Sequence, residues 1–223
     1  MDISPIAHIK SDFREKFGIP RQSGVVAELQ SLVIFEPECR NIDCLRGIEE
    51  YDYLWLIWEF SANGSREWSP TVRPPRLGGN VRRGVFATRS PYRPNPLGLS
   101  SVKLEAVKET ENGPVLLISG ADLMDGTPIY DIKPYISLDL HPDARYGLSG
   151  PRWERLLEVN FPPSLLDRLP PEKRSACIGV LQQDPRPAYQ HDPGRVYGVS
   201  FAGFDIRFRV EDGVLYVEDV VGL

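Results

Sequence analysis

The first 140 residues of this 223-residue sequence contain one strand signal after another, with no long amphipathic helix between them. The segment 51–60, YDYLWLIWEF, is aromatic and almost continuously apolar, which is typical of a strand buried on both faces. The strand-like runs 101–110 and 114–121 flank Glu111-Asn112-Gly113, and Asn-Gly favours the positive φ of a tight hairpin turn. A doubly wound dinucleotide-binding domain is unlike this pattern, because it alternates strands with helices and carries G-x-G-x-x-G after a strand. We therefore predict a mainly β fold built on a barrel or highly curved sheet.

The sequence changes character between about residues 141 and 170, where proline, glycine and serine separate short patterns that we interpret as helical, at 151–159 and 162–169. Pro171 suits the first turn of a longer helix, and one helix face would carry Ala176, Cys177, Val180 and Leu181. Two strand runs then flank Glu211-Asp212-Gly213, which predicts a second hairpin. We predict an N-terminal β-barrel domain at 1–145 and a small α+β domain at 146–223.

Composition argues against several classes of protein. No apolar stretch approaches the roughly 20 residues that span a bilayer, and the N-terminal residues lack an export signal, so we expect a soluble, cytoplasmic protein without a membrane partner. The three cysteines are odd in number and lack C-x-x-C spacing, and the three histidines lie far apart in the sequence. Neither a disulfide framework nor a metal site is predicted.

The net charge of −5 conceals a basic window. Residues 66 to 103 contain seven arginines and one lysine but a single acid, Glu67. The arginines stand among prolines, which restrict φ, and glycines, which permit close approach of a ligand. One interpretation is a solvated face whose charges pair with acids elsewhere. The other is a surface ordered in advance for an anion, and the planar arginine fork, which suits phosphate and carboxylate, favours it.

Several motifs in this order resemble the TsaA-like family, and within it the bacterial tRNA N6-methyltransferases. They are PRQ at 20–22, RPPRLGGN at 73–80, GVFATRSPYRPNPLGLS at 84–100, LMDGTPIYDIKPY at 123–135 and QDPRPAY at 183–189. The resemblance implies a β-barrel enzyme that uses S-adenosylmethionine, carries a small C-terminal domain and forms a homodimer with cofactor sites near the subunit interface. It implies methylation of the N6 nitrogen of N6-threonylcarbamoyladenosine at position 37 of tRNA, beside the anticodon.

The same resemblance assigns cofactor-binding residues. They are Pro20, Arg21, Gln22, Ser61, Ala62, Arg89, Leu99, Asp125, Gly126, Thr127 and Pro128. Arg89 can pair with the carboxylate of the cofactor through two hydrogen bonds. At Ser61-Ala62 the family pattern has a polar pair containing glutamine, so we expect only backbone contacts there.

The sequence also offers candidates for the chemistry. The substrate nitrogen must lose a proton, and a carboxylate or phenol could accept it, so we assign Asp184 or Tyr189 this role or that of holding the substrate. The arginines that we assign to the tRNA or its threonylcarbamoyl group are Arg73, Arg76, Arg82, Arg83, Arg93 and Arg186. An alternative is a module that senses S-adenosylmethionine and binds tRNA without transferring a methyl group. A hydrolase built on Ser100 or Ser101 lacks the G-x-S-x-G elbow.

Overall fold

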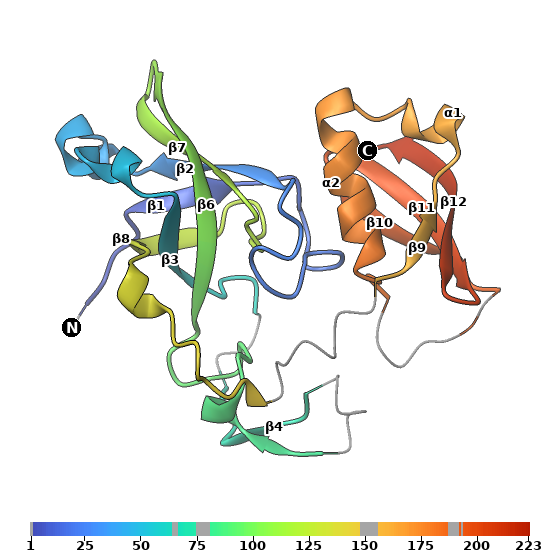
Figure 1. The fold of residues 1–223 in the computed structure, drawn as a ribbon, viewed down its shortest axis with the longest axis horizontal. Coiled ribbons are helices and arrows are strands. Elements are labelled where there is room, and N and C mark those ends of the chain that lie inside the picture. The colour runs from blue at the N-terminus through green and yellow to red at the C-terminus, as the bar shows by residue number, and fades with distance from the viewer. Residues whose placement is uncertain (1, 64–66, 75–80, 148–155, 187–191, 193) are drawn as a thin grey trace.

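A computed structural model describes residues 2–63, 67–74, 81–147, 156–186, 192 and 194–223, and Figure 1 shows two units in it. One unit contains β1 to β8, and the other contains β9 to β12 with two helices. The predicted fold class, mainly β with an N-terminal barrel and a small α+β C-terminal unit, is confirmed. The exact boundary at 145/146 stays a prediction.

Six strands pair in a closed ring, in the order β1-β2-β7-β6-β3-β8. Their bounds are Ala7–Lys10 (β1), Gln30–Phe35 (β2), Tyr53–Glu59 (β3), Leu97–Thr110 (β6), Gly113–Ser119 (β7) and Pro128–Pro134 (β8). The hairpin between β6 and β7 turns where the sequence predicts it, and Gly113 takes a φ of 98°. Because a closed ring has no free edges, its inward side chains can form a continuous apolar core.

Strand β3 differs from the prediction that both of its faces are buried. Leu54, Leu56 and Trp58 point into the core, whereas the residues between them are partly exposed. Outside the barrel, Trp55 and Tyr53 pack against Tyr135 of the segment after β8, with ring centroids 5.5 and 6.4 Å apart. The outer face of β3 is therefore aromatic, which makes an alternating strand resemble a continuously buried one in the sequence.

Short elements connect the barrel strands. Between β2 and β3 lie the 3-10 turns η1 (Pro37–Cys39), η2 (Ile42–Leu45) and η3 (Ile48–Glu50). A two-stranded ribbon of β4 (Thr71–Val72) and β5 (Arg83–Gly84) precedes η5 (Val85–Ala87), and η6 (Ser137–Asp139) follows β8. The basic window of the sequence thus contains this ribbon, which lies at one end of the molecule (Figure 1).

The C-terminal unit is a four-stranded sheet covered by a helix. The sheet order is β10-β11-β12-β9, with β9 at Glu158–Asn160, β10 at Tyr197–Phe201, β11 at Phe204–Glu211 and β12 at Val214–Gly222. Helix α1 spans Pro163–Leu166, and α2 spans Pro171–Gln182. The buried residues of α2 are the four predicted for its apolar face. The helical interpretation of 151–159 is wrong for Glu158 and Val159, because they belong to β9 and pair in parallel with β12, and residues 151–155 lie outside the described part of the chain.

The segment 11–29, between β1 and β2, belongs to both units. Phe13, Val26 and Leu29 lie in the apolar core of the C-terminal unit, and the Phe13 ring meets Phe201 edge-on at 5.5 Å. Asp12 binds the Lys173 ammonium of α2 at 2.6 Å and accepts a backbone hydrogen bond from Ala202 through its carbonyl. The barrel therefore contributes three buried side chains to the core of its neighbour.

Candidate active site

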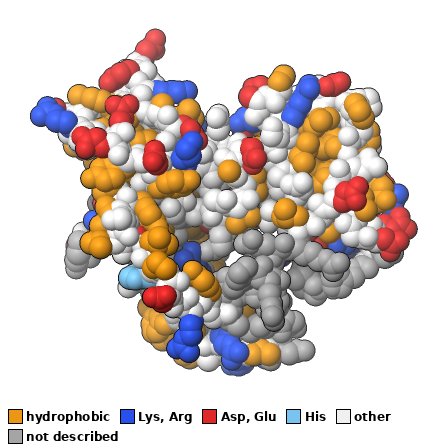
Figure 2. Space-filling model, in the orientation of Figure 1, with side chains coloured by type: hydrophobic (Ala, Val, Ile, Leu, Met, Phe, Trp, Pro, Cys, Tyr) orange, Lys and Arg blue, Asp and Glu red, His pale blue; other side chains and the backbone are white. Residues whose placement is uncertain are grey.

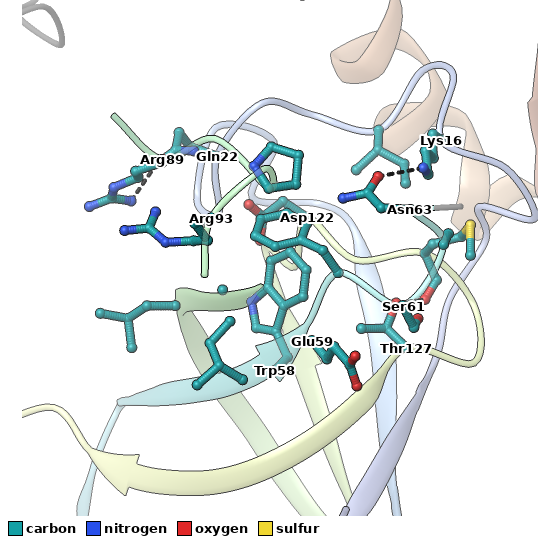
Figure 3. A pocket seen from close by; sticks show the side chains of 18 of the residues that line it. Lys16, Gln22, Trp58, Glu59, Ser61, Asn63, Arg89, Arg93, Asp122 and Thr127 are labelled. Carbon is teal, nitrogen blue, oxygen red and sulfur yellow. Dashed lines mark hydrogen bonds between the residues drawn. The ribbon is translucent and has the colours of Figure 1, made fainter. Parts of the chain in front are cut away.

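A pocket of about 570 Å³ opens on the barrel, within the usual size range of small-ligand sites. Its walls come from four parts of the chain that are distant in the sequence (Figure 3). These are the 16–22 part of the shared segment, the end of β3 with the residues up to 63, the 89–99 stretch leading into β6, and residues 122, 124 and 127 after β7.

Trp58 is the central apolar side chain of the pocket, with 7% of its surface exposed. Its partner across the sheet is Gly98 of β6, and a Cβ at this glycine would lie 2.3 Å from the indole ring. Only glycine lets the ring lie against β6 at this distance. Phe60 meets the indole edge-on at 4.3 Å, and a bulge against β8 lies beside Trp58. These contacts hold the indole in one orientation.

Asp122 is a partly buried carboxyl in the pocket wall. The Ser100 hydroxyl donates a hydrogen bond of 2.6 Å to Asp122 Oδ1, and Trp58 Nε1 donates one of 2.9 Å to Ser100 Oγ. Burial raises the pKa of Asp122, while the Ser100 hydrogen bond, backbone amides and the Arg89 charge act in the opposite direction. A chain of two hydrogen bonds thus runs from the indole to a carboxyl whose charged form is disfavoured.

Cationic side chains lie on other parts of the wall (Figure 3). The Arg89 guanidinium donates to Gln22 Oε1, Arg93 donates to the Thr88 carbonyl at 3.3 Å, and Lys16 donates to Asn63 at 2.6 Å. Glu59, the other carboxyl of the wall, accepts a hydrogen bond of 2.6 Å from the Tyr130 hydroxyl. The pocket therefore combines an apolar centre with both positive and negative groups.

The described part of the chain contains neither a cluster of metal ligands nor a helix that could span a membrane. No three His, Cys, Asp or Glu side chains there are grouped so that they could hold a metal ion. Within the same residues, no helix has both the length and the apolar character needed to cross a membrane.

Two domains of one known protein family match this chain, one in each part. The N-terminal domain of tRNA-methyltransferase O matches residues 8–139, and the TrmO C-terminal domain matches 154–223. The chain belongs to the TrmO family.

Relatives of the TrmO family cover the chain from end to end. The tRNA (adenine(37)-N6)-methyltransferase of Escherichia coli is 40% identical over 93% of this chain and 92% of its own. The tRNA (adenine(37)-N6)-methyltransferase of Eikenella corrodens is 45% identical over 78% of this chain and 98% of its own. The crystal structure of TrmO from Pseudomonas aeruginosa matches all of this chain and 99% of its own, with a TM-score of 0.80 and 32% identity.

Most of the cofactor residues that the TrmO-like motifs predict lie together in the pocket. Its described lining includes Pro20, Arg21, Gln22, Ser61, Ala62, Arg89, Leu99 and Thr127. Asp125, Gly126 and Pro128 belong to the same turn as Thr127 but are outside that lining. Asp125 binds Lys10 at 3.0 Å and accepts from the Ser11 amide at 2.9 Å, so its side chain ties the turn to the end of β1. The assignment of these residues to the cofactor stays a prediction.

The predicted substrate and catalytic residues are more scattered. Arg93 lines the pocket, whereas Arg73, Arg82 and Arg83 are exposed on the β4–β5 ribbon or beside it. Asp184 and Arg186 follow α2 and form a pair with two hydrogen bonds, of 2.8 and 2.9 Å, and the described pocket lining includes neither. Arg76 and Tyr189 lie outside the described residues.

Sequence reasoning missed several side chains of this TrmO-family pocket. Trp58 was interpreted only as part of an apolar strand, and Glu59, Phe60 and Asp122 were not singled out. A signal for Asp122 was present, because it follows the apolar run 114–121 directly and lies three positions before Asp125. Acidic residues at the end of a buried strand are candidates for a site, since the strand end fixes their position.

Proposed function

We propose that this protein transfers a methyl group from S-adenosylmethionine to the N6 nitrogen of N6-threonylcarbamoyladenosine at position 37 of tRNA. The observation that carries the proposal is the pocket, because motifs more than 100 residues apart supply an apolar centre, arginines and a carboxyl to one cavity. Similarity to a tRNA (adenine(37)-N6)-methyltransferase over 93% of the chain supports the same reaction.

The residues of the pocket fit S-adenosylmethionine chemically. Arg89 and Arg21 suit its carboxylate, the surfaces of Trp58, Phe60 and Leu97 suit an adenine and ribose, and the Glu59 carboxylate suits its positive charges. When bound, the cofactor supplies a methyl group already activated by the sulfonium. The protein has to align the acceptor nitrogen with that group and exclude water, which is catalysis by orientation and electrostatics.

The tRNA is an anion, and the threonylcarbamoyl group adds a carboxylate. We assign Arg93, at the pocket, to the modified base and Arg73, Arg76, Arg82 and Arg83 to the phosphates of the anticodon loop. Figure 2 shows Lys and Arg side chains at the end of the molecule where Figure 1 places β4. Arg186 has to leave Asp184 before it can reach the RNA.

The proposal also covers the roles of the two domains and the oligomeric state. The barrel domain, 1–145, holds the cofactor and carries the basic surface, and the C-terminal domain, 146–223, also contacts the tRNA. The protein acts in the cytoplasm. It forms a homodimer, and the interface covers exposed apolar side chains of η5 and η6 that do not line the pocket. Phe86 of η5 is 77% exposed and Leu138 of η6 is 78% exposed, which are unusual values for such residues and typical of an interface.

Mass spectrometry of tRNA nucleosides tests the reaction directly. The protein is incubated with S-adenosylmethionine and tRNA that carries N6-threonylcarbamoyladenosine, and the expected product is that nucleoside with one added methyl group. The same tRNA lacking the threonylcarbamoyl group is the control for substrate choice. Binding of S-adenosylmethionine and tRNA without any methylated product would instead support a sensing module.

A further inference from the structure

The methyl transfer requires an acceptor for the proton that leaves the substrate nitrogen. The lone pair of that nitrogen is delocalised into the purine ring and the neighbouring carbonyl, so the N–H bond must break before or during attack. A side chain that accepts this proton must reach the pocket. Among the described pocket residues, two carboxyls satisfy this condition, Glu59 and Asp122.

The contacts of the carboxyls distinguish between them. Glu59 is engaged by the Tyr130 hydroxyl at 2.6 Å. Asp184, which the sequence suggested, is bound by the Arg186 guanidinium through two hydrogen bonds, and the described pocket lining does not include it. Asp122 also accepts from a neutral hydroxyl, that of Ser100, but the Ser100 side chain is buried and its hydroxyl is itself fixed by the Trp58 indole.

We propose that Asp122 is the proton acceptor of the methyl transfer, positioned by Ser100 and Trp58. This inference rests on the proposed function. The N6–H bond breaks and its proton passes to an Asp122 carboxylate oxygen, while the nitrogen electron pair forms the new N–CH₃ bond. The S–CH₃ bond breaks with its electron pair remaining on sulfur, which leaves a neutral thioether.

The surroundings of Asp122 suit a base. Burial raises the pKa of its carboxyl, so its basicity is greater than that of an exposed aspartate, and a base is most effective when its pKa approaches the working pH. Ser100, the backbone at Ser23 and the Arg89 charge act against that rise and favour the ionised form that accepts the proton. Ser100 has 1% of its surface exposed, so its hydroxyl has a fixed position.

Asp122→Asn is the first test, because asparagine keeps the shape and an oxygen that can accept from Ser100. We expect single-turnover methylation to fall about 10²- to 10⁴-fold, the usual contribution of a general base, while calorimetry shows S-adenosylmethionine binding close to wild type. Asp212→Asn is the matched control. Asp212 lies in the β11–β12 turn with a φ of 49°, which asparagine also adopts, so this variant should resemble wild type in both measurements.

Ser100→Ala is the second test and does not depend on the stability of the first variant. Removing the Ser100 hydrogen bond removes an interaction that lowers the pKa of Asp122, so the pKa rises. Because the ionised carboxylate is the active form, the acidic limb of the rate–pH profile should move to higher pH. NMR titration of the Asp122 carboxyl in the free protein should show the same shift without any turnover.

Different results would contradict the role of Asp122 and the proposed function. Normal methylation by Asp122→Asn, or a pH profile of Ser100→Ala that matches wild type, would overturn the role of Asp122 and leave the function intact. A large loss of cofactor affinity in Asp122→Asn, with normal turnover at saturating cofactor, would also overturn it. A wild-type protein that binds S-adenosylmethionine but methylates no tRNA would overturn the function, and the base role with it.

Discussion

At the scale of single residues, the pocket depends on side chains whose positions are fixed by a few close contacts. The missing side chain of Gly98 leaves room for the Trp58 ring. The Trp58 indole orients Ser100 through a hydrogen bond, and Ser100 orients Asp122 in the same way. Arg89 is held in a different way, through Gln22 of the shared segment. A substitution at one position should therefore have consequences that differ according to the chain of contacts it interrupts.

Arg89→Ala should weaken S-adenosylmethionine binding. A hydrogen-bonded pair with the cofactor carboxylate is lost, and hydrogen bonds to charged groups contribute about 1.5 to 3 kcal/mol. Isothermal titration calorimetry measures the change. Arg186→Ala is the matched control, since that arginine is bound to Asp184 and should leave cofactor affinity unchanged. Equal losses of affinity in the two variants would contradict the separation of cofactor and substrate residues.

Gly98→Ala should destabilise the barrel and deform the pocket. The new methyl group would lie 2.3 Å from the Trp58 ring, so the indole has to move, and overpacking of this kind costs about 1 to 3 kcal/mol. Chemical denaturation measures the loss, and Trp fluorescence reports the displaced ring. Gly222→Ala is the control, because no described atom lies within 4 Å of a Cβ at that position. Equal stability of both variants would show that the ring is not held as described.

At the scale of elements, hairpins and the long helix could be predicted from sequence, and the pocket walls only in part. Gly113 marks its turn, and the apolar face of α2 follows from helical periodicity alone. Both features depend only on residues that are close together in the sequence, so one sequence is enough to predict them. The two-faced burial expected for β3 was wrong because aromatic residues outside a barrel resemble core residues. Asp122 was missed because its role depends on Ser100, a residue of the neighbouring strand, and one sequence does not reveal that pairing.

Phe13 connects two elements of different units, and Phe13→Ala should affect both. Its ring is 1% exposed in the C-terminal core, while its carbonyl accepts a hydrogen bond from the Asp125 amide at 2.8 Å. Removing a buried phenyl ring typically costs about 3 to 5 kcal/mol of stability. We expect a lower denaturation midpoint and weaker S-adenosylmethionine binding, since the segment also carries Pro20 to Gln22. Unchanged cofactor affinity in the folded variant would show that the pocket wall is independent of the C-terminal core.

At the scale of the whole molecule, an acidic protein has to bind an anionic substrate. The net charge is −5, so attraction to RNA must come from a local surface, and the exposed arginines of the ribbon supply one. The acidic remainder should limit binding elsewhere. Charge separation of this kind affects where the RNA docks more than how the chain folds.

The affinity for tRNA should fall with salt. Each phosphate contact contributes about 0.7 to 0.9 to the slope of log affinity against log salt concentration, and several contacts are expected. Replacing Arg82 and Arg83 by alanine should reduce the slope, while S-adenosylmethionine binding stays the same. Lys108→Ala, on β6 and outside the basic window, is the control and should retain the wild-type slope. A flat slope in wild type would remove the phosphate role of the arginines.

The sharing of segment 11–29 between the two units has a consequence for engineering. A chimera that exchanges only the C-terminal residues would combine the foreign core with Phe13, Val26 and Leu29, three side chains shaped for the original one. It would also separate Asp12 from Lys173, its ion-pair partner in this chain. The transplantable module is therefore discontinuous, with an inserted piece from the first part of the chain. Recombination between relatives should succeed most often when both pieces come from the same parent.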